Sequence, residues 1–221
     1  SKLSEDDFSN ENFKFGTSKA IKINNKKIYA QRLSYVGELG FELYIKMNES
    51  REIYNLIVSK GKEFNLSHCG MFAMDTMRME KGYLHWGHDM SPEENQYEAG
   101  LKFAISFKKN IDFVGKKALI KIKENQSKKK IMCFSLNNSE PGKPLLLHDE
   151  PILYEGTIVG RTTSGNFSFN YNKNLVFAYI KVDKSESIEG GKFEIEVEKT
   201  RYKLSIEHHP LFDPQNKYLK S

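Results

Sequence analysis

An aromatic ring and a carboxylate stand close together in the segment Tyr35-Val-Gly-Glu-Leu-Gly-Phe-Glu42, and together they could hold a flat heterocycle. Two apolar, strand-like stretches flank the Gly-Glu-Leu-Gly link, a pattern typical of a β-hairpin. If Val36 pairs with Phe41, Tyr35 lies opposite Glu42, because cross-strand partners share a face with their Cβ atoms about 5 Å apart. A carboxylate there could accept two parallel N–H donors from an amidine-like edge, such as that of a pterin. The segment is also compatible with an ordinary surface hairpin that carries one more exposed glutamate.

Other polar clusters predict less chemistry. His85 and His88 are spaced like metal ligands, but Gly87 indicates a loop and no cysteine or further histidine stands nearby in the sequence, so we expect no metal. Carboxylates are abundant without forming an acid/base pair, and no catalytic residue is predicted. The stretch Gly160-Arg-Thr-Thr-Ser-Gly165 lacks the spacing and the lysine of a phosphate loop, which favours a tight barrel turn.

The composition is that of an ordinary globular protein. With 38% hydrophobic and 29% charged residues in 221, the chain can bury a core of one or two domains. The net charge of +5 comes from scattered lysines and does not indicate nucleic acid, and no apolar stretch approaches the roughly 20 residues of a membrane helix. Cys69 and Cys133 form neither a disulfide framework nor a CxxC site, so we expect a reducing compartment, the cytoplasm. The chain begins without Met, at Ser1, and reads as a piece of something longer.

The first half predicts mixed strands and helices. Residues 13–45 are β-rich, with strands at 20–23 and 28–30 around an Asn-Asn turn. Ser50 is a candidate N-cap of a helix that ends at Gly61, and a second helix is predicted from about 69 to 81. In that second helix we expect Asp75 to pair with Arg78. The methionines at 71, 74 and 77 read as core filler.

The second half predicts an all-β domain. A strand at 103–107 and a linker into a short helix at 112–119 precede it, and we place the domain boundary near Asn110. Strands at 130–136, 151–154, 157–160, 176–182, 192–198 and 201–207 predict a small barrel or Greek-key domain. The fold class is therefore α+β, with one domain over residues 1–110 and an antiparallel β-barrel over 111–221.

The segment from Tyr35 to Glu42 closely resembles the Tyr-x-Gly-Glu-x-Gly-x-Glu signature of the aminomethyltransferase family. That family comprises the glycine-cleavage T-protein and the folate domains of dimethylglycine and sarcosine dehydrogenases. The similarity covers essentially the whole chain: residues 75–83 resemble the family's Asp-x-x-Arg-x-Glu-x-Gly helix, and residues 156–165 its C-terminal barrel motif. Glu80-Lys-Gly-Tyr83 and His85-Trp-Gly-His-Asp89 resemble the dehydrogenase branch more than the free-standing T-protein.

The resemblance implies a tetrahydrofolate site. Tyr35 and Glu42 match the residues that contact the folate in relatives, and Phe103 falls where relatives place an aromatic residue near it. Arg78 matches a family arginine that we interpret as structural, with a ligand role second. Met74 stands where the T-protein has an arginine, so a contact with the folate tail made by that arginine cannot be transferred.

The resemblance also implies a reaction in which tetrahydrofolate captures a one-carbon unit from an amine as 5,10-methylenetetrahydrofolate. The counterpart of the family's catalytic aspartate would lie upstream of Ser1, and so would a flavin domain with FAD, since no GxGxxG occurs here. We therefore expect a fragment of a dimethylglycine or sarcosine dehydrogenase-like enzyme, inactive alone, whose partners are folate, a methylated amine and the missing N-terminal half. A fragment of a free-standing T-protein and a non-catalytic folate-binding scaffold are the alternatives.

Overall fold

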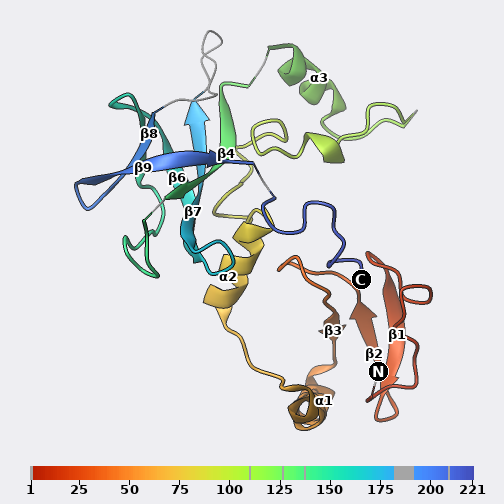
Figure 1. The fold of residues 1–221 in the computed structure, drawn as a ribbon. Helices are drawn as coiled ribbons and strands as arrows, with labels where there is room; N and C mark the ends of the chain where they lie inside the picture. The colour runs from red at the N-terminus through yellow and green to blue at the C-terminus, as the bar shows by residue number, and fades with distance from the viewer. Residues whose placement is uncertain (1, 110, 126, 137, 182–191, 209) are drawn as a thin grey trace. The chain divides into compact units, whose positions relative to one another are not determined.

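The computed structural model describes residues 2–109, 111–125, 127–136, 138–181, 192–208 and 210–221 (Figure 1). The chain forms two compact units, Ser1–Lys81 together with Phe212–Ser221, and Gly82–Leu211. The boundary that we predicted near Asn110 stays a prediction, and Asn110 itself lies outside the described residues.

The first unit is built on a three-stranded antiparallel sheet. Its strands β1 (Ser18–Ile23), β2 (Lys26–Gln31) and β3 (Glu42–Tyr44) lie in the order β1-β2-β3. Asn24 and Asn25 join the first two strands with φ of 47° and 60°, the left-handed values that a tight hairpin turn requires. The predicted strands at 20–23 and 28–30, and the Asn-Asn turn between them, are confirmed.

The sheet has one apolar face and one polar face, as the two-residue period of a strand requires. Ile21, Ile28 and Ala30 point into a core that they share with Phe13 and Ile53. The alternate residues of β2 and β3 are more exposed, and they carry the side chains of the candidate site.

Helix α1 (Met47–Gly61) and the 3-10 turn η1 (Lys62–Phe64) follow the sheet. The helix begins before Ser50, whose Oγ donates a 2.8 Å hydrogen bond to the carbonyl of Met47, so the prediction of Ser50 as N-cap is wrong. The predicted end at Gly61 is confirmed. A Cβ at Gly61 would lie 2.5 Å from Cδ1 of Leu66, so only glycine lets the chain fold back so closely there.

Helix α2 (Met71–Glu80) lies close to its predicted bounds, and Gly82 follows it with φ of 76°. The expectation that its methionines at 71, 74 and 77 fill the core is wrong for Met71, which is 66% exposed. Thr76, Met79 and Glu80 are buried instead, because positions three and four apart share one face of a helix.

The second unit opens with loops, the 3-10 turn η2 (Lys102–Ala104) and helix α3 (Lys116–Asn125). The linker into a short helix predicted at 112–119 is confirmed, although the helix, which begins at Lys116, extends further than predicted. The predicted strand at 103–107 is wrong, because its first residues form η2 and no strand begins there.

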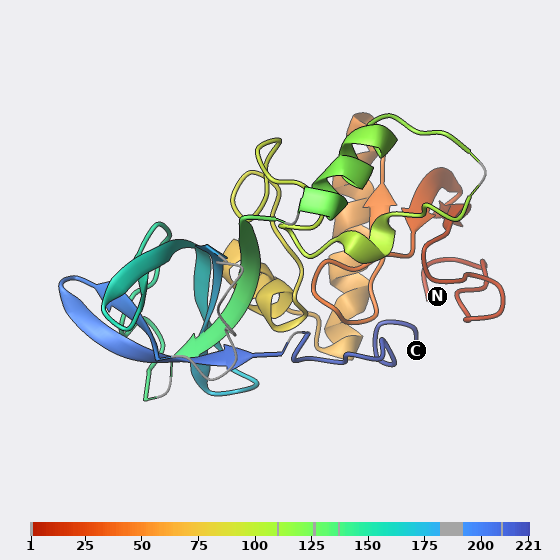
Figure 2. The same ribbon diagram turned by 90° about the horizontal axis from the view of Figure 1, so that it is seen from above.

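A closed antiparallel barrel follows, and its strands curve round on one another (Figure 2). The strands are β4 (Lys129–Leu136), β5 (Pro151–Tyr154), β6 (Thr157–Ser168), β7 (Lys173–Lys181), β8 (Phe193–Val197) and β9 (Thr200–Glu207). They close in the order β4-β7-β6-β5-β8-β9 around a core that includes Phe134, Val176 and Ile195. The α+β class with a C-terminal antiparallel barrel is confirmed.

The segment from Gly160 to Gly165 lies inside β6, so the tight turn predicted there is wrong. The strand pairing shifts between Thr162 and Ser164, as in a β-bulge. A Cβ at Gly160 would lie 2.0 Å from the carbonyl oxygen of Tyr179 on β7. The absence of a side chain at Gly160 therefore allows β6 and β7 to approach closely.

Among the described residues, no helix is both long and apolar enough to cross a membrane.

Candidate functional site

Glu42 is the first residue of β3, and its partner across the sheet is Gln31 instead of Tyr35. Residues 32–41 form a loop of successive bends between β2 and β3, so the predicted pairing of Val36 with Phe41 is wrong. Gly37 has φ of 79°, and a Cβ at Gly40 would lie 3.0 Å from the carbonyl oxygen of Leu33. The two glycines thus let the segment fold back on itself, where a ladder of paired strands needs extended residues.

The aromatic partner of Glu42 is Tyr44. The Tyr44 hydroxyl donates a 2.7 Å hydrogen bond to Oε2 of Glu42, since residues two apart on a strand share a face. This hydrogen bond and the negative charge of the carboxylate raise the pKa of Tyr44 above its ordinary value of 10.0, so the phenol remains a donor. A carboxylate has about four lone-pair sites, so Glu42 can accept two further N–H donors beside this hydroxyl.

Tyr29 extends this surface, because it stands directly opposite Tyr44 in the β2–β3 pairing. The two tyrosines are 56% and 55% exposed, and their strands lie about 4.8 Å apart. We call Tyr29, Gln31, Glu42 and Tyr44 the polar face of the sheet. It offers two aromatic rings, an amide and a carboxylate to one ligand, a donor and acceptor set that fits a pterin ring. Glu42 is exposed in the first unit, so water competes with a ligand for its carboxylate oxygens. A strong bidentate contact requires a recess from which water is excluded.

Tyr35 lies partly buried in the loop next to this face, and Arg32 fixes the start of that loop. Arg32 is 1% exposed, and its guanidinium donates a 2.7 Å hydrogen bond to the carbonyl of Phe13. The Arg32 backbone also pairs with Gly16 and Thr17, at 2.8 and 3.0 Å. The loop therefore leaves the sheet from a rigid base.

Arg78 is buried on α2 and forms the local pair that we predicted. Its Nε donates a 2.7 Å hydrogen bond to Oδ1 of Asp75, and one terminal nitrogen lies 2.7 Å from the same oxygen. This geometry supports the structural interpretation of Arg78, while a ligand role stays a prediction.

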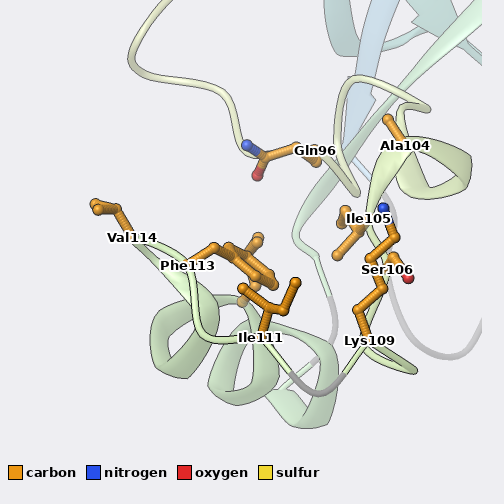
Figure 3. Close-up of a pocket in the computed structure, with 9 residues that line it drawn as sticks. Gln96, Ala104, Ile105, Ser106, Lys109, Ile111, Phe113 and Val114 are labelled. Atoms are coloured by element: carbon orange, nitrogen blue, oxygen red, sulfur yellow. The ribbon is translucent and has the colours of Figure 1, made fainter.

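Phe103 belongs to the second unit and is 86% exposed on η2. Phe103 does not line the neighbouring pocket of about 500 Å³, although Ala104, the next residue, does. In this pocket Gln96, Ile105 and Lys109 face Ile111 and Phe113 (Figure 3). Its lining mixes apolar walls with an amide and an ammonium group. A contact of Phe103 with folate stays a prediction.

A buried carboxylate that the sequence did not single out connects two of the motifs. Asp89 is fully buried, and its Oδ1 accepts hydrogen bonds from Thr163 Oγ1 and Ser164 Oγ at 2.5 and 2.7 Å. Its Oδ2 accepts the backbone N–H of His85 at 2.9 Å. The His85 and His88 rings lie 4.6 Å apart, yet within the described ranges no three histidine, cysteine or carboxylate side chains gather as metal ligands. Asp89 thus fastens the 85–89 loop to β6.

The sequence matches two models of one family. The GCVT N-terminal domain matches residues 1–109, and the glycine cleavage T-protein C-terminal barrel domain matches residues 129–213. The solved aminomethyltransferase T of the glycine cleavage system from Bartonella henselae has the same fold, with a TM-score of 0.73 and 21% identity over 83% of this chain and 49% of that one. The chain belongs to the aminomethyltransferase (glycine-cleavage T-protein) family.

Within this family, the chain is similar to amine dehydrogenases and to free-standing transferases. Human mitochondrial dimethylglycine dehydrogenase is 37% identical over 95% of this chain and 24% of its own length. Mouse mitochondrial sarcosine dehydrogenase is 30% identical over 97% and 23%, and the aminomethyltransferase of Symbiobacterium thermophilum is 33% identical over 82% and 47%. The chain thus spans about a quarter of the length of the dehydrogenases.

Proposed function

We propose that this chain supplies the polar face on which an aminomethyltransferase domain holds tetrahydrofolate, with Glu42 as the acceptor for the pterin edge. The observation that carries the proposal is the Glu42–Tyr44 pair beside Tyr29 on one exposed face of the sheet. In this arrangement the carboxylate would orient the pterin through two N–H donors, and the tyrosine rings would stack against it. Tyr35, and Phe103 in the second unit, are further candidate contacts.

The reaction that we propose is the capture of a one-carbon unit from an amine, giving 5,10-methylenetetrahydrofolate. Tetrahydrofolate supplies the nucleophilic nitrogen, while the residues of this chain bind and orient it. The polar face is open, so we propose that another part of a longer dehydrogenase-like protein covers it and provides the acid/base group. The length of the dehydrogenase relatives supports that view. A flavin cofactor, FAD, would then bind to that other part of the longer protein. The cytoplasmic location of the protein stays a prediction.

Calorimetric titration with 5-formyltetrahydrofolate, a stable reduced folate, tests the binding role. The titration should use the 221-residue chain and the longest natural polypeptide that contains it. Removing a charge-assisted contact from a face that excludes water costs about 2 kcal/mol or more, so in the longer polypeptide Glu42→Ala should weaken binding roughly 30-fold. Tyr44→Phe keeps the ring and loses the hydroxyl, so its Kd should rise only about two- to five-fold.

Glu52→Ala is the matched control, because Glu52 is another carboxylate of the same unit that is ion-paired with Lys26 on the surface. Its Kd should equal that of the wild type. Equal Kd values for the wild type and Glu42→Ala would contradict the proposal. Methylene transfer by the 221 residues alone would show that no further part is needed.

A further inference from the structure

The last residues of the chain return to the first unit and are tied to the end of α2. We call residues 212–221 the tail. Lys81, which follows α2 and is 2% exposed, donates a 2.6 Å hydrogen bond from Nζ to the carbonyl of Asp213. The same Nζ lies 3.2 Å from Oδ2 of Asp213, and the two side chains are 1% and 3% exposed. A buried ammonium group is costly without a partner, so Lys81 depends on a docked tail.

Asp213 also organises the tail itself. Its carboxylate accepts the backbone N–H groups of Lys217 and Leu219, at 2.6 and 3.2 Å. Burial by itself raises the pKa of Asp213, but these N–H groups and the Lys81 ammonium outweigh it and hold the pKa below 3.8. Leu219 is 2% exposed, and the Phe212 N–H bonds the carbonyl of Glu80 at 2.9 Å. The tail therefore has one defined docked conformation.

Both attachment points of the tail also touch the loop that carries Tyr35. Arg32 begins that loop, and its second terminal nitrogen donates a 2.9 Å hydrogen bond to the carbonyl of Ser221. Gly37, in the middle of the loop, is buried against the aliphatic stem of Lys81, where an added Cβ would lie 2.7 Å from both Cγ and Cδ. Lys81 and Arg32 are thus two buried cations whose charged groups bind the tail. The aliphatic stem of Lys81 packs against the loop at Gly37, and Arg32 is itself the first residue of the loop.

We propose that Lys81 and Arg32 are positioning residues of a latch, through which the docked tail holds the 32–41 loop, and with it Tyr35 and Glu42, in the conformation that binds a reduced folate. The ligand part of this inference rests on the proposed function, but the coupling of tail and loop does not. Coupling between two sites is reciprocal, so a ligand that orders the loop must also hold the tail down. A tail that served only general stability would leave the loop's own opening rate unchanged.

Hydrogen–deuterium exchange of the 221-residue chain measures both segments at once. Lys81→Met keeps the stem that packs on Gly37 and loses only the ammonium group, so it isolates the link to the tail. We expect about tenfold faster exchange in the tail and in the 32–41 loop, with unchanged exchange in the barrel. Lys60→Met is the matched control: it removes the exposed Lys60–Glu63 pair of the same unit and should change neither segment.

Gly37→Ala approaches the latch from the other side, because its methyl group would displace the Lys81 stem and φ of 79° disfavours alanine. It should loosen the tail through Lys81, to which the three atoms nearest to the added methyl group belong. If Lys81→Met fails to fold, Asp213→Asn takes its place: it removes the charge that pairs with Lys81, and it also weakens the hydrogen bonds from Lys217 and Leu219 within the tail. Unchanged loop exchange in a variant whose tail has loosened would overturn the latch.

A ligand arm separates the latch from the folate proposal. With 5-formyltetrahydrofolate, the wild-type tail should exchange several-fold more slowly, and Lys81→Met or Glu42→Ala should abolish this protection. Folate binding that leaves the tail unprotected in the wild type would overturn the latch and leave the proposed function intact. If no Glu42-dependent binding occurs, the proposed function fails, while the coupled exchange of tail and loop without ligand still decides the latch.

Discussion

Replacing Asp89 with alanine should destabilise the second unit strongly, because this fully buried carboxylate accepts hydrogen bonds from Thr163, Ser164 and the His85 N–H. Hydrogen bonds to charged groups contribute about 1.5–3 kcal/mol each, but contributions within one network do not add. Thr163 keeps its contact to the carbonyl of Phe177, at 3.3 Å, which reduces the loss. We therefore expect a cost of about 3–5 kcal/mol.

Asparagine at this position gives a sharper version of the same test. Its amide oxygen can still accept from Thr163 and Ser164, but its NH₂ group would face the His85 N–H, where the carboxylate placed an acceptor. Donor facing donor leaves one contact broken, so Asp89→Asn should cost about 1–3 kcal/mol, less than alanine. The order of the two variants checks the assignment of each oxygen.

The chain offers its own probe and control for this measurement. Trp86 is the single tryptophan and lies three positions from Asp89, so urea unfolding followed by its fluorescence reports on the second unit. Asp149→Asn is the control, since the Asp149 side chain is 56% exposed, its pairs with His148 and Arg161 are surface contacts, and asparagine tolerates its φ of 66°. Such contacts contribute about 0–1 kcal/mol. A loss below about 1 kcal/mol for Asp89→Ala, or equal losses for both aspartates, would refute the reasoning.

Two further predictions concern ionisation and can be checked on the same protein. Burial, followed by the charge of Glu207, raises the pKa of the Cys133 thiol to about 12. Iodoacetamide at pH 8 should therefore alkylate the exposed Cys69 first and Cys133 only when the protein unfolds. Peptide mass mapping would show this order. Burial alone raises the pKa of Glu207, but hydrogen bonds from Lys173 and Ser135 and the Lys173 charge outweigh it and hold the pKa below 4.5. A carboxyl group whose pKa is lower in the folded state than in the unfolded chain stabilises the folded state at pH values above its unfolded pKa. The contribution of Glu207 to the free energy of unfolding is therefore complete above about pH 4.5 and is lost as the pH falls through its lower folded pKa. Glu207→Gln should therefore flatten the acid side of the stability–pH curve, and an unchanged curve would contradict the pKa direction.

The strands of the barrel could be predicted from the sequence because each strand is indicated by a pattern of neighbouring residues. Short strands with a two-residue period, separated by turn residues such as Glu155-Gly156, predicted the six strands and most of their bounds to within one residue. The exceptions are β6, which extends to Ser168 instead of 160, and β7, which begins at Lys173 instead of 176; residue 182, the predicted end of that strand, lies outside the described residues. The strand order and the closure are long-range properties, and they followed only from the family resemblance and the structure. The contact of Asp89 with Ser164 joins residues 75 positions apart, and no local pattern reveals such a pair.

The candidate site was predicted in part. The sequence predicted Glu42 as a carboxylate beside the ring of Tyr35, whereas the ring that contacts it is that of Tyr44, and its contact with folate stays a prediction. The rule that residues two apart on a strand share a face could have found it. The hairpin prediction failed because Gly37 and Gly40 were assigned to a four-residue link between two strands, whereas they allow a longer loop to fold back on itself. Loop conformation depends on what the loop packs against, here Lys81, and the sequence does not show that.

The placement of the tail has a consequence for the order of synthesis. Arg32 and Ser221 are 189 positions apart, with the whole barrel between them in the chain. At translation rates of about 5–20 residues per second, the ribosome needs on the order of ten seconds or more to make the intervening stretch. During that time the first unit lacks the segment that pairs with Lys81, so this unit is completed only after the whole barrel has been made.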